Sequence, residues 1–308
     1  MKRVVFGLLV AAVGAMLMYG REHRVGNASP TSFAIATSGD CSDHFRNHNS
    51  RFTAVVNSEE THSIANQPLS IRAEKNGGIS VTTWDGPEFS VTLCKQVAAD
   101  DESAARKILD ETRLAVEGST VSVAAPERSD SSNVSTLLLV KAPQNANVSL
   151  KVKNGGASIY KFSGTAEAET TNGGISLKNS TGKLTVHAKN GGVSIRDCGG
   201  DVNANVTNGG LSIALPERWE GKGLEAHTQN GGLAISVPKN FSSGLEVVAS
   251  EYVGVVCRGT ACQNAQKTKE DGRQTLRLGS GEPQIHASTQ NGGVVIKDTE
   301  RDYANAKQ

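Results

Sequence analysis

The chain has 308 residues, a formal net charge of +1, 37% hydrophobic residues and 4% aromatic residues. A charge so close to zero supplies no global field that would attract nucleic acid or an anionic membrane, so no nucleic-acid partner is expected. The low aromatic content argues against a core of large interlocking side chains and suits stacked coils that bury small and β-branched residues.

Residues 1–20 have the features of a targeting segment. Lys2 and Arg3 precede an apolar run that ends before Arg21, as in a secretory signal peptide. The run is close to the roughly 20 residues that span a bilayer, so cleavage and retention as a membrane anchor both stay open. The sequence therefore predicts export to the periplasm, cell envelope or cell surface, with membrane association through residues 1–20 if they are retained.

A polar linker is expected over residues 21–50. It contains residue types that ligate zinc, namely Cys41, Asp43, His44 and His48, but their spacing fits no closed four-ligand site. We therefore predict no metal site and no cofactor.

The cysteines suggest disulfides, which export permits. Cys257 and Cys262 flank a short loop and could pair across a hairpin. Cys41 with Cys94 is a second candidate pair, and Cys198 is then the free thiol.

Residues 51–145 are predicted to form an N-terminal capping segment. Its composition favours a short helix near residues 101–115, with acidic residues at the start. The strand before Asn76 is one register off from the strand before Asn154, so we expect a bulge or shift there. Such a cap protects the strand edges of a terminal coil. Residues 299–308 form a polar tail.

A repeated Asn-Gly-Gly tripeptide dominates the rest of the chain. Its asparagines are Asn76, Asn154, Asn172, Asn190, Asn208, Asn230 and Asn291. Between Asn154 and Asn208 every step is 18 residues (172 − 154, 190 − 172, 208 − 190), the next step is 22 (230 − 208), and the last is 61 (291 − 230). The last step is long enough for extra coils or an inserted hairpin.

Each repeat has the alternation of two short strands. The third and fifth residues after each asparagine are apolar, as in Ile175 and Leu177, and a second alternating run follows Gly164, Gly182 and Gly200. The pattern predicts an all-β fold, a single-chain parallel β-solenoid or β-helix of about 18-residue coils over residues 146–298. The structural turns are at Asn154, Asn172, Asn190, Asn208, Asn230 and Asn291.

The turn residues have physical roles. Glycine adopts positive φ at little cost, whereas other residues pay about 1–2 kcal/mol. Asparagine tolerates such turns, and stacked coils permit a ladder of asparagine amides.

The chain resembles a group of bacterial β-strand-repeat proteins that are described as adhesins and have no established function. The resemblance rests on residues 76–85, on the Lys141-Ala142-Pro143 step, on the 18-residue repeats and on the final Asn291-Gly292-Gly293. It covers roughly residues 51–298. It implies an exported β-solenoid with a surface or adhesive role and supplies no catalytic residues.

The outward side of the second strand of each repeat is the candidate ligand face. It presents one column of Glu169, His187 and Asn205 and a second of Thr171, Lys189 and Thr207. Rows of short polar groups suit an extended glycan or another cell-envelope polymer, although any solvated sheet face has a similar composition.

Three functions stay open at this point. The first is a non-enzymatic, adhesin-like surface or periplasmic protein that binds a polymer or a partner protein. The second is a membrane-anchored envelope scaffold or regulatory protein. The third is a polysaccharide-active β-helix enzyme, such as a lyase or hydrolase. No catalytic residues are predicted, because the acidic side chains of Glu167 and Glu169 do not stack on acidic residues of the next repeat.

Overall fold

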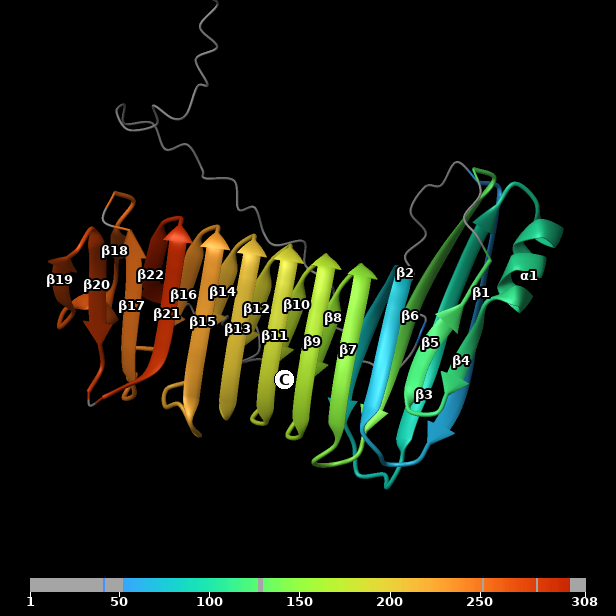
Figure 1. Ribbon diagram of the computed structural model, residues 1–308, viewed down its shortest axis with the longest axis horizontal. Coiled ribbons are helices and arrows are strands. Elements are labelled where there is room, and N and C mark those ends of the chain that lie inside the picture. The colour runs from blue at the N-terminus through green and yellow to red at the C-terminus, as the bar shows by residue number, and fades with distance from the viewer. Residues whose placement is uncertain (1–40, 42–51, 127–129, 251, 281, 300–308) are drawn as a thin grey trace, which may run out of the picture. The chain divides into compact units, whose positions relative to one another are not determined.

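The computed structural model describes residues 41, 52–126, 130–250, 252–280 and 282–299. The chain winds between two sheets, called sheet A and sheet B here (Figure 1). In spatial order sheet A contains β1 (Ala54–Ile64), β3 (Phe89–Ala99), β6 (Ser132–Ala142), the second half of β2 (Leu69–Thr83), β8 (Ala157–Tyr160), β10 (Ile175–Lys178), β12 (Val193–Arg196), β14 (Leu211–Ala214), β16 (Leu233–Val237), β22 (Val294–Asp298) and β18 (Val255–Cys257). In spatial order sheet B contains β4 (Arg113–Glu117), β5 (Thr120–Ala124), the first half of β2, β7 (Asn147–Asn154), β9 (Thr165–Asn172), β11 (Lys183–Asn190), β13 (Asp201–Asn208), β15 (Gly223–Asn230), β21 (Pro283–Asn291), β17 (Gly244–Ser250), β20 (Arg273–Leu278) and β19 (Gln266–Glu270).

Apolar side chains stack in columns between the two sheets. Ile159, Leu177 and Ile195 are direct partners on adjacent parallel strands, and each is at most 1% exposed. The column continues through Ile213 and Ile235. The predicted parallel β-solenoid, with an N-terminal segment that contains one short helix, is therefore confirmed.

The Asn-Gly-Gly turns also stack in register. Gly173 has a φ of +150°, and a Cβ placed there would lie 1.6 Å from the carbonyl oxygen of Gly155 in the preceding coil. Only glycine fits such an approach. Beside the glycines, the asparagine side chains form a hydrogen-bonded ladder, in which Asn172, Asn190, Asn208, Asn230 and Asn291 each donate from Nδ2 to the Oδ1 of the preceding asparagine at 2.9–3.2 Å.

The spatial order of the coils departs from the sequence order at both ends. At the C-terminal end β21 lies between β15 and β17, and β22 lies between β16 and β18 (Figure 1). The last strands of the described chain are therefore inserted inside the terminal coil. The hairpin β19–β20, which lies within the 61-residue step, extends sheet B beyond that coil.

At the N-terminal end β2 lies between the coil of β5 and β6 and the coil of β7 and β8. Asn76 pairs with Asn154, so the capping segment expected over residues 51–145 supplies a coil of the same stack. The predicted register shift is present as a bulge in β2. Ala73 pairs with Val152 and Asn76 pairs with Asn154, so β2 contains one residue more than β7 between these two pairs.

Helix α1 (Glu102–Glu111) packs on β1 and β3. It begins at the N-cap Asp101, whose carboxylate accepts a 2.8 Å hydrogen bond from the backbone N–H of Ala104. At its other end the buried Lys95 ammonium donates to the carbonyl oxygens of Leu109 and Thr112 at 3.2 and 2.6 Å. Lys95 thus supplies a charged donor at the C-terminal end of the helix, where the last carbonyl oxygens have few partners within the helix.

Two disulfides connect distant or looped segments, Cys41–Cys94 and Cys257–Cys262. Cys198 is a free, buried thiol that donates to the carbonyl oxygen of Arg196 at 3.3 Å. Burial raises the pKa of the Cys198 thiol above its usual value.

The targeting segment, the linker other than Cys41, and residues 300–308 of the polar tail lie outside the described residues. Among the helices that are described, none is long and apolar enough to cross a membrane.

Candidate functional site

The outer side of sheet B, called the sheet B face here, carries the first predicted column. Glu169, His187 and Asn205 are direct partners on β9, β11 and β13. They point outward because the residues beside them along each strand are buried in the solenoid. Lys151 precedes them, with its Nζ 3.4 Å from the Oε2 of Glu169, and His227 follows them. The Lys151–Glu169 pair is about half exposed, so it contributes little energy.

The second predicted column lies next to the asparagine ladder. Thr171, Lys189 and Thr207 each stand one residue before the ladder asparagine of their strand. Thr171 and Lys189 are exposed, and Thr207 is half-buried. The structure thus brings all six predicted residues onto one face, with neighbouring coils roughly 4.8 Å apart.

Several polar residues of this face were missed in the sequence. Glu225, His286 and Glu246 form one further column on β15, β21 and β17. The Nδ1 of His286 lies 3.4 Å from an oxygen of Glu246, and the Arg277 guanidinium lies 2.6 Å from the other oxygen of the same carboxylate. A signal was available, because His286 and Glu225 each stand five residues before a ladder asparagine, as Asn203 does (291 − 286, 230 − 225, 208 − 203).

The face offers hydrogen-bonding groups in repeated rows. His227 and Ser288 are direct partners and lie 3.0 Å apart between Nδ1 and Oγ, and the amide of Asn205 donates to Asn203 at 2.6 Å. Glu246 is already engaged by Arg277, so Glu225 and Glu246 do not form a free carboxylate pair. In the described part of the chain, no group of three His, Cys, Asp or Glu side chains is placed to hold a metal ion.

One of the zinc-type residues of the linker, Cys41, lies within the described residues. Cys41 is engaged in the disulfide with Cys94. Asp43, His44 and His48 lie outside the described residues.

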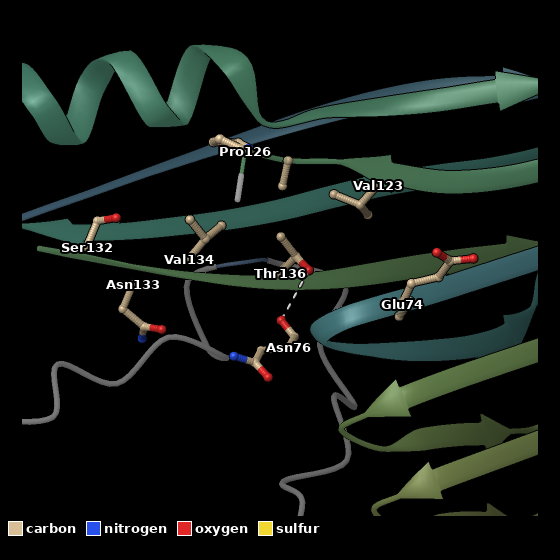
Figure 2. A pocket seen from close by; sticks show the side chains of 10 residues that line it. Glu74, Asn76, Val123, Pro126, Ser132, Asn133, Val134 and Thr136 are labelled. Carbon is tan, nitrogen blue, oxygen red and sulfur yellow. Dashed lines mark hydrogen bonds between the residues drawn. The ribbon is translucent and has the colours of Figure 1, made fainter. Parts of the chain in front are cut away.

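A small cavity lies at the β2 bulge, between β2, the end of β5 and the start of β6 (Figure 2). Its volume is about 50 Å³. The lining mixes apolar side chains such as Val123 and Val134 with polar ones such as Glu74 and Asn133. The hydroxyl of Thr136 donates to the carbonyl oxygen of Asn76 at 3.5 Å. A cavity of this size holds a few water molecules or one small substituent rather than a sugar ring.

Comparisons with known proteins give one family match. The family model described as Toastrack DUF4097 matches residues 63–297. No curated protein matches the chain.

Solved structures of similar fold cover about four fifths of the chain. One is a proposed cell adhesion protein from Clostridium sporogenes, with 12% identity, a TM-score of 0.32, and coverage of 79% of this chain and 100% of that one. Another is a proposed adhesin from Bacteroides fragilis, with 10% identity, a TM-score of 0.30, and coverage of 80% and 97%. A third is a proposed lipid-binding protein from Parabacteroides distasonis, with 11% identity, a TM-score of 0.32, and coverage of 79% and 97%.

Proposed function

The chain belongs to the Toastrack DUF4097 family, and on that premise we propose that it is an exported, non-enzymatic, adhesin-like protein whose sheet B face binds an extended envelope polymer such as a glycan. The observation that carries the proposal is the register of polar side chains, in which Glu169, His187 and Asn205 repeat once per coil. A polymer with regularly spaced hydroxyl or charged groups can contact several coils at once, and each added contact raises its effective affinity.

The electrostatics of this face support a polar, uncharged or zwitterionic polymer. Glu167 and Glu169 on β9 lie between Lys151 and Lys153 on β7 and Lys183 and Lys189 on β11, so acidic and basic side chains adjoin on this face. A strongly charged polymer of either sign would meet like charges on one or more of these coils. Hydrogen bonding to hydroxyl groups has no such conflict.

The test is a binding screen against purified envelope polysaccharides, followed by two double variants. His187→Ala with Lys189→Ala removes groups from the sheet B face. Lys178→Ala with Arg196→Ala removes two side chains from the opposite sheet and serves as the matched control. We expect the first variant to weaken binding at least about fivefold, because it removes two polar contacts of about 0.5–1.5 kcal/mol each, and the control to bind normally. Equal affinities of both variants and the wild type would exclude the sheet B face.

A second candidate is an envelope scaffold that is held to the membrane by residues 1–20. The disulfide Cys41–Cys94 supports it, since it fixes the chain that follows the apolar segment to β3 of the solenoid. N-terminal sequencing of the exported protein separates the alternatives. An intact segment of residues 1–20 favours the scaffold, and a cleaved one favours the free binding protein.

The enzymatic alternative is tested by the release of reducing sugars from the same polysaccharides. Glycosidases require two carboxyl groups on either side of the scissile bond. On the sheet B face Glu225 and Glu246 lie on either side of the strand of His286, and Glu246 is held by Arg277. Sustained sugar release would refute the non-enzymatic proposal.

A further inference from the structure

The outer side of sheet A, called the sheet A face here, differs in charge from the sheet B face. One registered column on it contains, in spatial order, Lys141, Thr82, Tyr160, Lys178, Arg196, Ala214, Ser236 and Lys297. The column beside it contains serines on β8 to β14, and neither column contains an acidic residue. Within the described residues these four cations form no ion pair. The net charge of the whole chain conceals this difference between its faces.

Acidic residues lie near the column but not in it. Asp197 follows Arg196 in the turn, and Asp298 follows Lys297, with its carboxylate accepting a hydrogen bond from the hydroxyl of Thr260. Glu59 on the outermost strand β1 is the direct partner of Cys94, so it lies on the sheet A face at the N-terminal end. The Nζ of Lys178 lies 5.8 Å from the centre of the Tyr160 ring. The central part of the face is therefore cationic, with an aromatic side chain at its edge.

Toward the C-terminal end the same face becomes apolar. The serine column continues as Ala234, Val295 and Val256, which are direct partners. Val295 is 46% exposed and Val256 is 42% exposed. Tyr252 and Val253, in the turn that precedes β18, are 92% and 57% exposed. Val253 Cγ1 lies 3.2 Å from the position that a Cβ would take at Gly293, the residue that precedes β22, so Val253 adjoins the end of this face. Contiguous exposed apolar side chains mark an interaction site.

Toward the N-terminal end the same face carries Cys41. Cys41 packs with Cys94, Leu137 and Leu139, whereas the intervening Leu138 belongs to the interior core. Since alternate residues of a strand point to opposite sides, Cys41 lies on the sheet A face. The 20 residues from 21 to 40 could span up to about 70 Å when extended, which is enough for the face to lie against a bilayer that holds residues 1–20.

We propose that the sheet A face is a membrane-docking surface, which binds anionic lipid headgroups through its cationic column and inserts Tyr252 and Val253 into the interfacial region. Each lysine or arginine near an anionic bilayer raises partitioning about fivefold. Tyrosine suits the interface between membrane and water because its ring is apolar and its hydroxyl group is polar and can stay hydrated. The inference goes beyond the proposed function, because polymer binding is assigned to the opposite face, and each can fail without the other.

The first test is sedimentation of the full chain with phosphatidylcholine vesicles that contain or lack 30% phosphatidylglycerol. Binding to neutral vesicles reports residues 1–20, which every variant retains, and the increment with phosphatidylglycerol reports the face. We expect Lys178→Glu with Arg196→Glu to reduce that increment at least about tenfold. The matched control, Lys183→Glu with Lys189→Glu on the sheet B face, changes the net charge equally and should retain the increment. Equal loss in both variants, or loss in neither, would overturn the proposal.

The second test reports insertion directly. Tyr252→Trp should show additional quenching of tryptophan fluorescence on vesicles that contain brominated phosphatidylglycerol. Val116→Trp, at an exposed apolar position on β4 of the other sheet, should show none. Absence of quenching at position 252 would contradict the docking geometry. If the Lys178 and Arg196 side chains instead bound a soluble anionic polysaccharide while the protein ignored the vesicles, the face would be a glycan site and the lipid proposal would be wrong.

Discussion

The Nδ2 of Asn291 donates a 2.9 Å hydrogen bond to the Oδ1 of Asn230, although 61 positions separate the two residues in the sequence. This contact continues the ladder that links the 18-residue repeats. It shows that β21 and β22 complete the stack beside β15 and β16, with β17 and β18 placed outside them. The terminal coil thus holds the end of the chain in the sheet.

The ladder predicts a measurable contribution from each amide. Asn190→Ala removes the bonds to Asn172 and Asn208, and we expect a loss of about 1–2 kcal/mol in the free energy of unfolding, since a net hydrogen bond contributes about 0.5–1.5 kcal/mol. Urea denaturation checks the value. Gln229→Ala, an exposed amide next to the ladder, is the control and should change stability by less than about 0.5 kcal/mol. If the two variants were equally stable, the ladder would have no energetic role.

The stacked turns predict a contrast between two glycines of positive φ. Gly173→Ala should cost more than about 4 kcal/mol or prevent folding, because its Cβ would meet the Gly155 carbonyl oxygen of the neighbouring coil at 1.6 Å. Gly118→Ala should cost only about 1–2 kcal/mol, since Gly118 has a φ of +57° and nothing within 4 Å of the added atom. Thermal unfolding of both variants makes the comparison. Similar costs would show that the close stacking of the turns is absent.

The stability of helix α1 in the N-terminal cap is expected to depend on the buried ammonium group of Lys95. Lys95→Met removes the bonds to the carbonyl oxygens of Leu109 and Thr112 and the 3.8 Å ion pair with Glu60. We expect a loss of about 3–6 kcal/mol, since hydrogen bonds to charged groups contribute about 1.5–3 kcal/mol each and two are lost. Hydrogen exchange of helix α1 should accelerate. Lys107→Met on the exposed side of the same helix should leave the exchange rates unchanged, and an identical effect of both variants would contradict the assignment.

The thiol of Cys198 is expected to react only after the protein unfolds. It is buried, and its raised pKa disfavours the thiolate, which is the reactive form. A neutral thiol reagent at pH 8 should therefore modify no cysteine in the native protein and one in denaturant. Above the ordinary thiol pKa of about 8.5, the unfolded thiol ionises before the folded one, so stability should fall as the pH rises further. Rapid labelling of the native protein would place Cys198 outside the core.

The C-terminal edge strand of sheet B, β19, is expected to prevent two copies of the protein from associating end to end. Lys267 and Lys269 on β19 pair with the buried residues Leu276 and Gln274 of β20, yet every residue of β19 is exposed. Charged side chains at such positions discourage further strand pairing. Lys267→Val with Lys269→Val should increase self-association in sedimentation velocity, and Gln266→Val with Thr268→Val, on the opposite side of the strand, should increase it less. If both double variants remained monomeric, the lysines would not be what prevents association.

The repeats were predictable because period-two alternation and glycine spacing are local properties of the sequence. The column of Ile159, Leu177 and Ile195 could be read directly from the constant 18-residue step. The positions of β17 to β22 could not, since nothing local distinguishes a strand that adds to the end of a stack from one that inserts beside β15. The columns of the candidate ligand face could be predicted for the same reason as the core column, because the constant 18-residue step brings equivalent residues of successive coils next to one another. The column of Glu225, His286 and Glu246 was missed because its two steps, 61 (286 − 225) and 40 (286 − 246), are unequal and run in opposite directions along the sequence.

The most direct test of the stacked architecture is a pulsed dipolar measurement between spin labels in a Cys198→Ser background. Labels replace Ser158 and, in separate samples, Ser212, Val295 or Val256, which all lie in one registered column of sheet A. At roughly 4.8 Å per strand, the account predicts separations of about 14, 24 and 29 Å, so that position 295 lies closer to position 158 than position 256 does. A shorter distance to position 256, or distances that do not rise in these steps, would contradict the stack and the insertion of its last strands.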